Sequence, residues 1–224
     1  MKLLAIDTSG PLCSAALLVD HQTIQRIETA PRRHAELILP MMDALLREAG
    51  LRLADLDALA YGHGPGSFTG VRIAAAVAQG AAFGAGLPVV GVSTLAALAQ
   101  GSWRSGQAAQ VLCALDARMG EVYWGAYAVD AHGIMRPCGR DQVGPPQQVR
   151  LPAGGDWSGA GSGWEEYAGV LEDAVGVLPR LPQGHCEARD LAILAAAAHL
   201  EGAVAAQDAL PVYLRDRVAE PPRR

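Results

Sequence analysis

The chain repeats one pattern of hydrophobic and polar positions. Residues 3–7 read Leu-Leu-Ala-Ile-Asp and lead through a small turn into the apolar stretch 13–19. Residues 112–116 read Leu-Cys-Ala-Leu-Asp and lead through a second turn into the β-rich stretch 122–129. An apolar run, a short turn and a second apolar run are typical of a β-hairpin. The recurrence predicts two related subdomains that face each other across a cleft, each with an aspartate at a strand end.

Strand-like runs alternate with apolar positions at helical spacing along the rest of the chain, which predicts an α/β protein. Pro40 falls inside one helical stretch and is expected to kink or restart that helix. The polar, glycine-containing stretch 101–110 predicts a boundary between subdomains at 1–104 and 105–224, with the last helix packing back on the first subdomain. The other expected elements are strands at about 2–7, 12–19, 23–29, 59–61 and 88–92, helices at about 34–49, 67–85, 93–100, 164–174 and 189–201, and a terminal strand or extended segment at 211–214.

The glycine-rich stretch 62–70, Gly-His-Gly-Pro-Gly-Ser-Phe-Thr-Gly, is the strongest local motif. It joins a strand to a helix, which places free backbone N–H groups at a positive helix end. Gly64, Gly66 and Ser67 are therefore candidates for holding a nucleotide phosphate. The alternative is that the glycines let the helix pack closely on the sheet. The stretch is not a P-loop, because that motif needs a lysine and the only lysine of the chain is Lys2.

Asp7 and Asp116 end the first strand of each predicted hairpin. Two carboxylates that face each other across a cleft suit a hydrated Mg²⁺ ion held against phosphates. The alternative is that each aspartate accepts hydrogen bonds from its own hairpin turn. The absence of a lysine near either residue favours the hairpin alternative.

Neither a metal site nor a catalytic set is expected. The six histidines form no pair at i and i+4, and the sequence holds neither H-E-x-x-H nor the G-x-S-x-G elbow. The four cysteines, which lie far apart, are expected to be reduced, and Cys13 and Cys113 fall in predicted core strands. A net charge of −5 argues against a surface that holds RNA without a partner. Since no signal peptide or membrane-spanning run is found, we expect a cytoplasmic protein without membrane contact.

Two of the predicted helices are apolar on more than one side. The helix over 34–49 has more apolar positions than one buried face needs, and the helix that ends near 85 carries small residues that allow another helix to approach closely. Packing inside the chain is the alternative. The excess nevertheless predicts a partner interface. Its candidate residues are Leu37, Met41, Leu45, Gly70, Ala74, Ala78 and Ala81.

Five stretches in order along the chain resemble the TsaB (YeaZ) family of bacterial tRNA threonylcarbamoyladenosine biosynthesis proteins. The stretches over 64–73 and 116–123 are the distinctive ones, and the match spans nearly the whole chain. The five stretches read Leu-Ala-Ile-Asp-Thr-Ser at 4–9, Gly-Pro-Gly-Ser-Phe-Thr-Gly-Val-Arg-Ile at 64–73, Val-Ser-Thr-Leu-Ala-Ala-Leu-Ala at 92–99, Asp-Ala-Arg-Met-Gly-Glu-Val-Tyr at 116–123 and Pro-Val-Tyr-Leu-Arg at 211–215.

The resemblance implies the two-subdomain α/β fold of actin, sugar kinases and heat-shock ATPases (the ASKHA fold), with a reduced second subdomain. It also implies binding to the paralogous catalytic subunit TsaD and to the ATPase TsaE, and contact with tRNA only through that complex. A homodimer is expected when the partner is absent. The catalytic paralogue holds a metal through an H-x-x-x-H pair, whereas residues 93–98 here contain no such ligand. Gly161, in the stretch 159–163, marks what remains of an adenosine pocket, so no cofactor is expected to bind tightly, although the complex interface suits ATP or ADP.

Three functional hypotheses follow. The preferred one is a non-catalytic subunit that supports threonylcarbamoyl transfer to the adenosine beside the tRNA anticodon by docking its paralogue. The second is an ATP-binding enzyme, an ATPase or a small-molecule kinase, that uses Asp7 and Asp116. The third is a peptidase, a label attached to the wider family, for which the sequence offers no motif.

Overall fold

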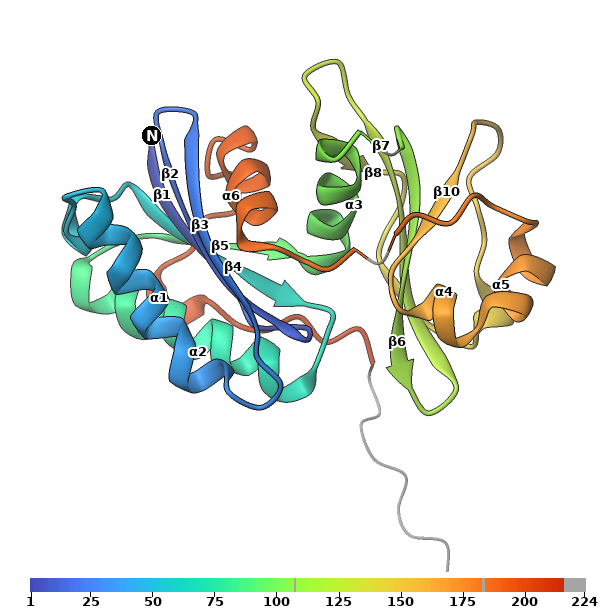
Figure 1. Cartoon of the computed structure of the whole chain (residues 1–224), viewed down its shortest axis with the longest axis horizontal. Coiled ribbons are helices and arrows are strands. Elements are labelled where there is room, and N and C mark those ends of the chain that lie inside the picture. Colours follow the sequence, from blue (N-terminus) through green and yellow to red (C-terminus); the bar gives the residue numbers. More distant parts are fainter. Residues whose placement is uncertain (107, 183, 216–224) are drawn as a thin grey trace, which may run out of the picture.

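The computed structural model describes residues 1–106, 108–182 and 184–215 of the 224-residue chain. Two mixed β-sheets of five strands each lie side by side, with two helices between them (Figure 1). Each sheet begins with an antiparallel hairpin and adds a parallel strand on the other side of the hairpin's first strand. This arrangement confirms the predicted α/β fold of two related subdomains.

The first sheet has the strand order β3-β2-β1-β4-β5. Successive side chains of β1 are buried on opposite faces, Leu4 and Ile6 in one core and Leu3 and Ala5 in the other. A strand that is buried on both faces is expected to be continuously apolar, as β1 is. The strands are β1 (Lys2–Asp7), β2 (Leu12–Val19), β3 (Gln22–Thr29), β4 (Ala58–Gly64) and β5 (Val89–Ser93).

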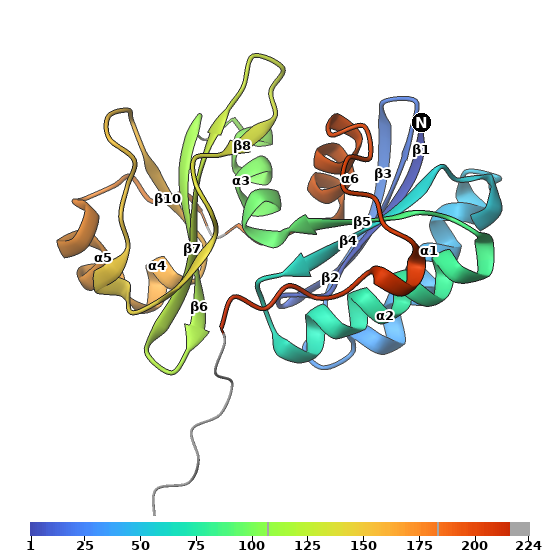
Figure 2. The ribbon, with the colours of Figure 1, turned by 180° about the vertical axis from the view of Figure 1, so that it is seen from behind.

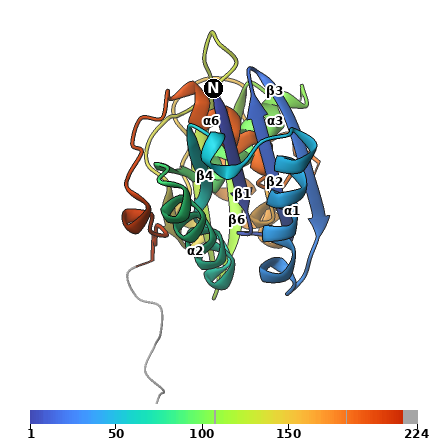
Figure 3. The same ribbon diagram turned by 90° about the vertical axis from the view of Figure 1, so that its left-hand side faces the viewer.

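Helices cover both faces of the first sheet. Figure 3 shows α1 (His34–Glu48) and α2 (Phe68–Ala85) on one face, and α6 (Ala188–Ala197) packs on the other. The helix α1 continues through Pro40, so it does not restart there, and the alternative expectation of a kink stays a prediction. Burial of Ile38, Met42 and Leu45 on both sides of Pro40 offsets the one backbone hydrogen bond that proline removes.

The second sheet has the strand order β10-β6-β7-β8, and β9 also pairs with β7. The helix α3 (Thr94–Arg104) packs on its inner face through Leu95, Leu98 and Ala99. The helices α4 (Gly163–Glu166) and α5 (Ala168–Val175) cover the outer face. The strands are β6 (Gln110–Arg118), β7 (Glu121–Val129), β8 (Met135–Pro137), β9 (Gln142–Gly144) and β10 (Ser158–Ala160), and the 3₁₀ helices of the chain are η1 (Leu53–Asp55), η2 (Pro146–Gln148) and η3 (Ala206–Asp208).

At the junction of the lobes, each sheet is covered by a helix from the other half of the sequence. The helix α3 precedes the expected boundary after residue 104, yet it packs on the second sheet, whereas α6 follows that boundary and packs on the first sheet. The two helices also contact each other between the lobes. Whether 1–104 and 105–224 fold as separate units stays a prediction, and residues 216–224 of the second range lie outside the described part.

The C-terminal strap, residues 204–215, runs from the first sheet to the β6–β7 hairpin (Figure 2). Val204 pairs with Val89 at the edge of β5. The amide of Val212 donates to the carbonyl of His63 at 2.8 Å. Arg215 then donates to the carbonyl oxygen of Ala117 at 3.1 Å. The terminal segment predicted at 211–214 as a strand or an extended stretch is therefore an extended tie between the lobes, without a strand of its own.

Candidate functional site

The two aspartates that end β1 and β6 both accept hydrogen bonds from their own hairpin turns. The Oδ2 atom of Asp7 accepts from the amide of Ser9 at 3.2 Å and from the Ser9 hydroxyl at 3.1 Å. The Oδ1 atom of Asp116 accepts from the amide of Arg118 at 2.8 Å, and its Oδ2 lies 3.0 Å from the guanidinium of the same arginine. These bonds are the ones that the hairpin alternative requires. A role of the two carboxylates in holding Mg²⁺ stays a prediction.

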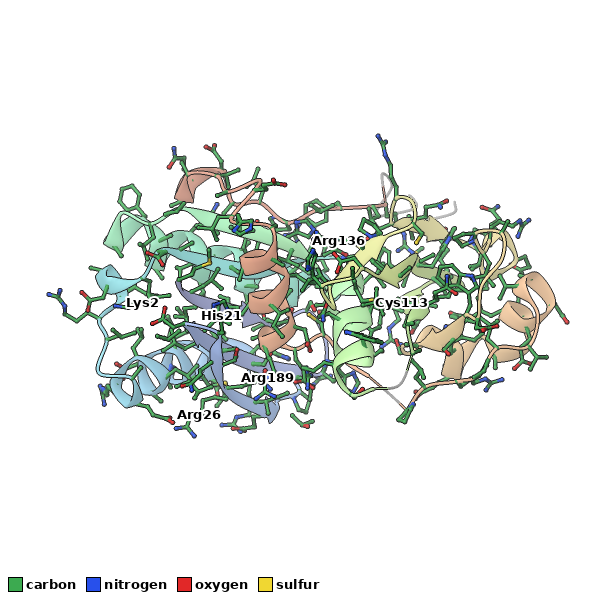
Figure 4. All side chains as sticks on the ribbon, turned by 90° about the horizontal axis from the view of Figure 1, so that it is seen from above. Lys2, His21, Arg26, Cys113, Arg136 and Arg189 are labelled. Carbon is green, nitrogen blue, oxygen red and sulfur yellow. The ribbon has the colours of Figure 1, made fainter. Side chains whose placement is uncertain are left out.

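Asp7 is fully buried, and none of the described lysine, arginine or histidine side chains pairs with it. Burial raises its pKa to about 6, although the hydrogen bonds from Ser9 act in the opposite direction. Its Oδ1 atom accepts no hydrogen bond from any N–H or O–H group that the structure describes. Gly62 packs against this oxygen so closely that a Cβ atom there would lie 2.2 Å from it. Lys2, the only lysine, lies at the far end of the first lobe from the second (Figure 4).

The glycine-rich loop packs directly on the β1–β2 hairpin. A Cβ atom on Gly70 would lie 2.0 Å from the carbonyl oxygen of Thr8, and one on Gly66 would lie 2.7 Å from that of Ser9. The amide of Ser67 donates to the Ser9 carbonyl at 2.8 Å, and the Ser67 hydroxyl caps α2 by accepting from the amide of Gly70. The packing alternative accounts for these glycines. Phosphate binding by Gly64, Gly66 and Ser67 stays a prediction.

Burial of His63 in the same loop lowers its pKa to about 4. The imidazole is therefore neutral near neutral pH and supplies no charge for a phosphate. Lys2 is distant and His63 is neutral, so neither residue supplies a positive charge for a phosphate beside Asp7. This environment weakens the hypothesis of an ATP-binding enzyme.

The second lobe repeats the glycine packing. Gly161 has a φ of +102°, and a Cβ atom there would lie 2.4 Å from the carbonyl oxygen of Ala114 on β6. The next residue, Ser162, accepts a hydrogen bond from the amide of Asp116 at 3.1 Å. Gly161 thus holds the turn after β10 against β6. Its expected contact with adenosine stays a prediction.

The sequence did not reveal a polar cluster at the junction of the lobes. The Ser93 hydroxyl donates to Oδ2 of Asp141 at 2.6 Å, and the Tyr127 hydroxyl donates to Oδ1 of the same carboxylate. Burial raises the pKa of Asp141 above its usual value. The Ser93 hydroxyl also caps α3, because it accepts a hydrogen bond from the amide of Ala96. Asp141 lies in a stretch without periodicity, so no local signal connects it with Ser93.

A second candidate surface lies between α1 and α2. A groove of about 540 Å³ runs between the two helices, the α1–α2 groove, and its surface is mainly apolar. Leu39 beside it is 54% exposed. Such a face is the kind of surface that another protein covers. The residues lining the groove are Leu39, Met42, Asp43, Leu46, Leu53, Ala76, Val77, Gly80 and Ala81.

Four of the predicted interface residues lie in the core, so the prediction that they face a partner is wrong. Leu45, Gly70, Ala74 and Ala78 are buried against the first sheet or the β1–β2 hairpin, so they have no surface to offer a partner. Small residues at helical spacing serve close packing inside a chain as well as between chains, and the spacing alone does not separate the two. Leu37, Met41 and Ala81 are half-buried at the edge of the same core, and Ala81 lines the groove. They stay candidates.

All four cysteines are free, and Cys13, Cys113 and Cys186 are buried. Cys13 and Cys113 are buried on β2 and β6, as predicted. Burial raises the pKa of Cys13 to about 11 and those of Cys113 and Cys186 well above the usual value. Among the described residues, no group of three or more histidine, cysteine, aspartate or glutamate side chains is arranged to hold a metal ion. None of the described helices is long and apolar enough to cross a membrane.

Comparison with known proteins gives a consistent set of relatives. A family model for TsaD, tRNA N6-adenosine threonylcarbamoyltransferase, matches residues 18–222. The Escherichia coli (strain K12) protein named tRNA threonylcarbamoyladenosine biosynthesis protein TsaB is 44% identical over 230 aligned residues, which cover 98% of this chain and 96% of the relative.

Solved structures agree with the sequence comparison. YeaZ from Pseudomonas aeruginosa superposes with a TM-score of 0.88 at 46% identity, covering 95% of this chain and 99% of that one. A second crystal structure from the same organism, described as an uncharacterized protein with similarity to peptidase YEAZ, gives the same TM-score and identity and covers 96% and 99% of the two chains. Both matches extend over both lobes.

Proposed function

The chain belongs to the TsaB family, and on that premise we propose that it serves tRNA threonylcarbamoyladenosine biosynthesis as a docking subunit rather than as the transferase itself. Its partner in this proposal is the catalytic paralogue, a TsaD-like protein, joined by a TsaE-like ATPase. The α1–α2 groove is the observation that carries the proposal. Contact with tRNA at the modified adenosine is then made by the complex as a whole.

The chemistry of the lobe junction supports the docking role. Asp7 is buried without a cation, His63 is neutral, and the glycine-rich loop is occupied by the β1–β2 hairpin. An ATP-dependent enzyme needs an open seat with neutralising charge for three phosphates. A titration of the purified chain with Mg-ATP separates the two hypotheses, since binding tighter than roughly 10 μM, about −7 kcal/mol, would favour the enzyme.

The groove also explains how the chain would behave alone. An apolar face of this kind is costly in water, so two copies would cover it by pairing when the paralogue is absent. Gel filtration of the chain with and without the TsaD-like subunit tests this expectation. If adding the TsaD-like subunit replaces the homodimer by a complex with one copy of each subunit, the same surface serves both assemblies.

Substitution in the groove tests the proposed interface. Ala76 is exposed, and a Cβ atom on Gly80 would meet no atom within 4 Å, so Ala76→Arg and Gly80→Arg place a charge in the groove without disturbing the core. Both variants are expected to lose co-purification with the paralogue and threonylcarbamoylation of tRNA by the mixture. Ala131→Arg, at an exposed turn of the second lobe, is the matched control. This variant is expected to keep both co-purification with the paralogue and threonylcarbamoylation of tRNA.

Two results would contradict the proposal. Complex formation by both groove variants at the wild-type level would show that the α1–α2 groove is not the interface. Threonylcarbamoyl transfer to tRNA by this chain alone would show that it is itself the enzyme.

A further inference from the structure

An exposed stack of an arginine and two aromatic rings lies where α2 begins, on the side of the helix next to the C-terminal strap. The guanidinium carbon of Arg72 lies 3.2 Å from the ring centroid of Phe68 and 5.3 Å from that of Tyr213. The two ring centroids are 6.3 Å apart, with an angle of 39° between the planes. The strap supplies Tyr213, so the stack exists only because the strap passes this end of α2.

None of the three side chains is needed to fill the core. Phe68 is 51% exposed and Tyr213 is 48% exposed. Among the residues that the structure describes, no carboxylate lies within ion-pair distance of Arg72, whose recorded contacts are with the two rings. Large aromatic rings are usually buried and arginines are usually hydrated or paired. Within the described part of the chain the three side chains are neither buried nor paired with a carboxylate, so they are available to a ligand.

The cationic surface continues from the stack to the β6–β7 hairpin. Arg215, two residues after Tyr213, donates to the carbonyl oxygens of Ala117 and Arg118, and it also pairs with Glu121. Arg118, with a side chain that is 87% exposed, pairs with Asp116. Counting described residues alone, Arg72, Arg118 and Arg215 stand against Asp116 and Glu121, an excess of one positive charge on a chain whose net charge is −5.

Flat aromatic faces beside guanidinium groups suit one class of ligand, a nucleic acid with an unpaired base. An unpaired nucleobase stacks on aromatic rings and on the guanidinium plane, and neighbouring phosphates pair with arginines. We infer that Phe68, Arg72 and Tyr213 form a stacking site for an unpaired base of RNA, with Arg118 and Arg215 beside the adjoining phosphates. The inference rests on the proposed function, since it names this chain's own contact with the RNA that is modified.

The stack residues do not line the α1–α2 groove. Arg72 lies one helical turn before the groove residue Ala76, so the two surfaces are neighbours on α2, and the strap contacts the helix again where Gln79 donates to the carbonyl of Gln207. A defect in RNA binding is nevertheless distinguishable from a defect in complex formation. The first leaves co-purification with the paralogue intact, and the second leaves RNA affinity of the isolated chain intact.

Fluorescence anisotropy with a labelled RNA hairpin that has an adenosine-containing loop tests the inference on the full chain. Fully paired RNA of the same length is the comparison probe. Phe68→Leu and Tyr213→Leu remove a ring but keep an apolar side chain, and Arg72→Lys keeps the charge but removes the planar group. Each is expected to weaken hairpin binding at least about fivefold. The control Arg180→Gln, which removes a guanidinium paired with Glu172 on the outer side of the second lobe, keeps wild-type affinity.

Preference of the wild-type chain for the looped RNA, lost in the three stack variants, would support the stacking site. Equal affinity for paired and looped RNA would overturn it, as would a lack of binding by the wild-type chain at roughly 100 μM, the weak limit of non-specific affinity. Loss of co-purification with either protein partner by the stack variants, with RNA affinity unchanged, would show a protein-docking surface instead and would also overturn it.

Discussion

At the scale of single residues, the protonation state of Asp7 depends strongly on its surroundings. A carboxylate buried without a cation is disfavoured when it is ionised. Ser9 offsets part of that cost through two hydrogen bonds, and Gly62 leaves just enough space for Oδ1. An aspartate at a strand end suggests a metal ligand, whereas the bonds that this carboxylate accepts come from its own hairpin turn.

The burial of Asp7 predicts how the free energy of unfolding changes with pH. Its pKa is raised from 3.8 to about 6 in the folded chain, so between these values the folded state binds more protons than the unfolded state. The free energy of unfolding therefore falls as the pH rises through this interval. Above about pH 6 the full destabilisation from ionising buried Asp7 is present. Asp7→Asn removes the ionisation. Its free energy of unfolding relative to wild type is expected to rise by roughly 2–3 kcal/mol from about pH 4 to about pH 7.

Urea unfolding of the two proteins at each pH provides the measurement, because the titration of other groups cancels in the comparison. Ser9→Ala is a second variant, which removes a hydrogen bond that lowers the pKa of Asp7. In that variant the decline in stability is expected to extend to higher pH. A difference between Asp7→Asn and wild type that is constant with pH would contradict the assignment.

At the scale of the elements, α2 shows how one amino acid type takes opposite roles along a single helix. Gly70 lies against the backbone of Thr8, where no Cβ atom has room. Gly84, on the same helix, has nothing within 4 Å of the corresponding position. The first glycine is required by packing between α2 and the β1–β2 hairpin. The second contributes only the conformational freedom that weakens a helix.

The same substitution at these two positions is expected to have opposite effects. Gly70→Ala forces α2 away from the hairpin and should lower the free energy of unfolding by more than about 2 kcal/mol. Gly84→Ala should raise it by about 0.5–1 kcal/mol, because alanine favours the helical backbone. Thermal or urea unfolding measures both. Equal effects of the two changes would show that the close approach at Gly70 is absent in solution.

At the scale of the whole molecule, several polar contacts among the described residues join one lobe to the other. Ser93 binds Asp141, Arg215 of the strap binds the β6–β7 hairpin, and Arg104 of α3 binds Asp190 of α6. The last tie is the most demanding, since the Asp190 side chain is fully buried and burial raises its pKa. Arg104 donates to both of its carboxylate oxygens, at 2.8 and 3.0 Å.

Breaking the Arg104–Asp190 pair is expected to be asymmetric. Arg104→Met leaves a buried carboxylate without a cation and should cost about 3–5 kcal/mol. Asp190→Asn should cost less, because Arg104 is partly exposed and keeps Glu187 at 3.3 Å. The double variant should be more stable than Arg104→Met alone. A double-mutant cycle by urea unfolding measures the coupling, and additive effects would mean that the pair does not act as a unit.

Much of the fold follows from local signals in the sequence. The two hairpins ending in Asp7 and Asp116, the caps at Ser67 and Ser93 and the continuously apolar strands are set by residues close together along the chain. Periodicity and capping are local, so the order and type of these elements are determined before any long-range contact is known. The restart predicted at Pro40 failed because burial of the neighbouring residues outweighs a local preference.

Only the tertiary structure decided which surfaces are free. The sequence predicts Leu45, Gly70, Ala74, Ala78 and Ala81 as interface residues, yet the first four are covered by the sheet and hairpin, whereas Ala81 lines the groove beside Ala76 and Gly80. The contacts of Asp141 with Ser93 and of Tyr213 with Arg72 likewise join distant segments. Burial depends on which segments pack together, and that packing is a property of the whole chain, not of any local stretch.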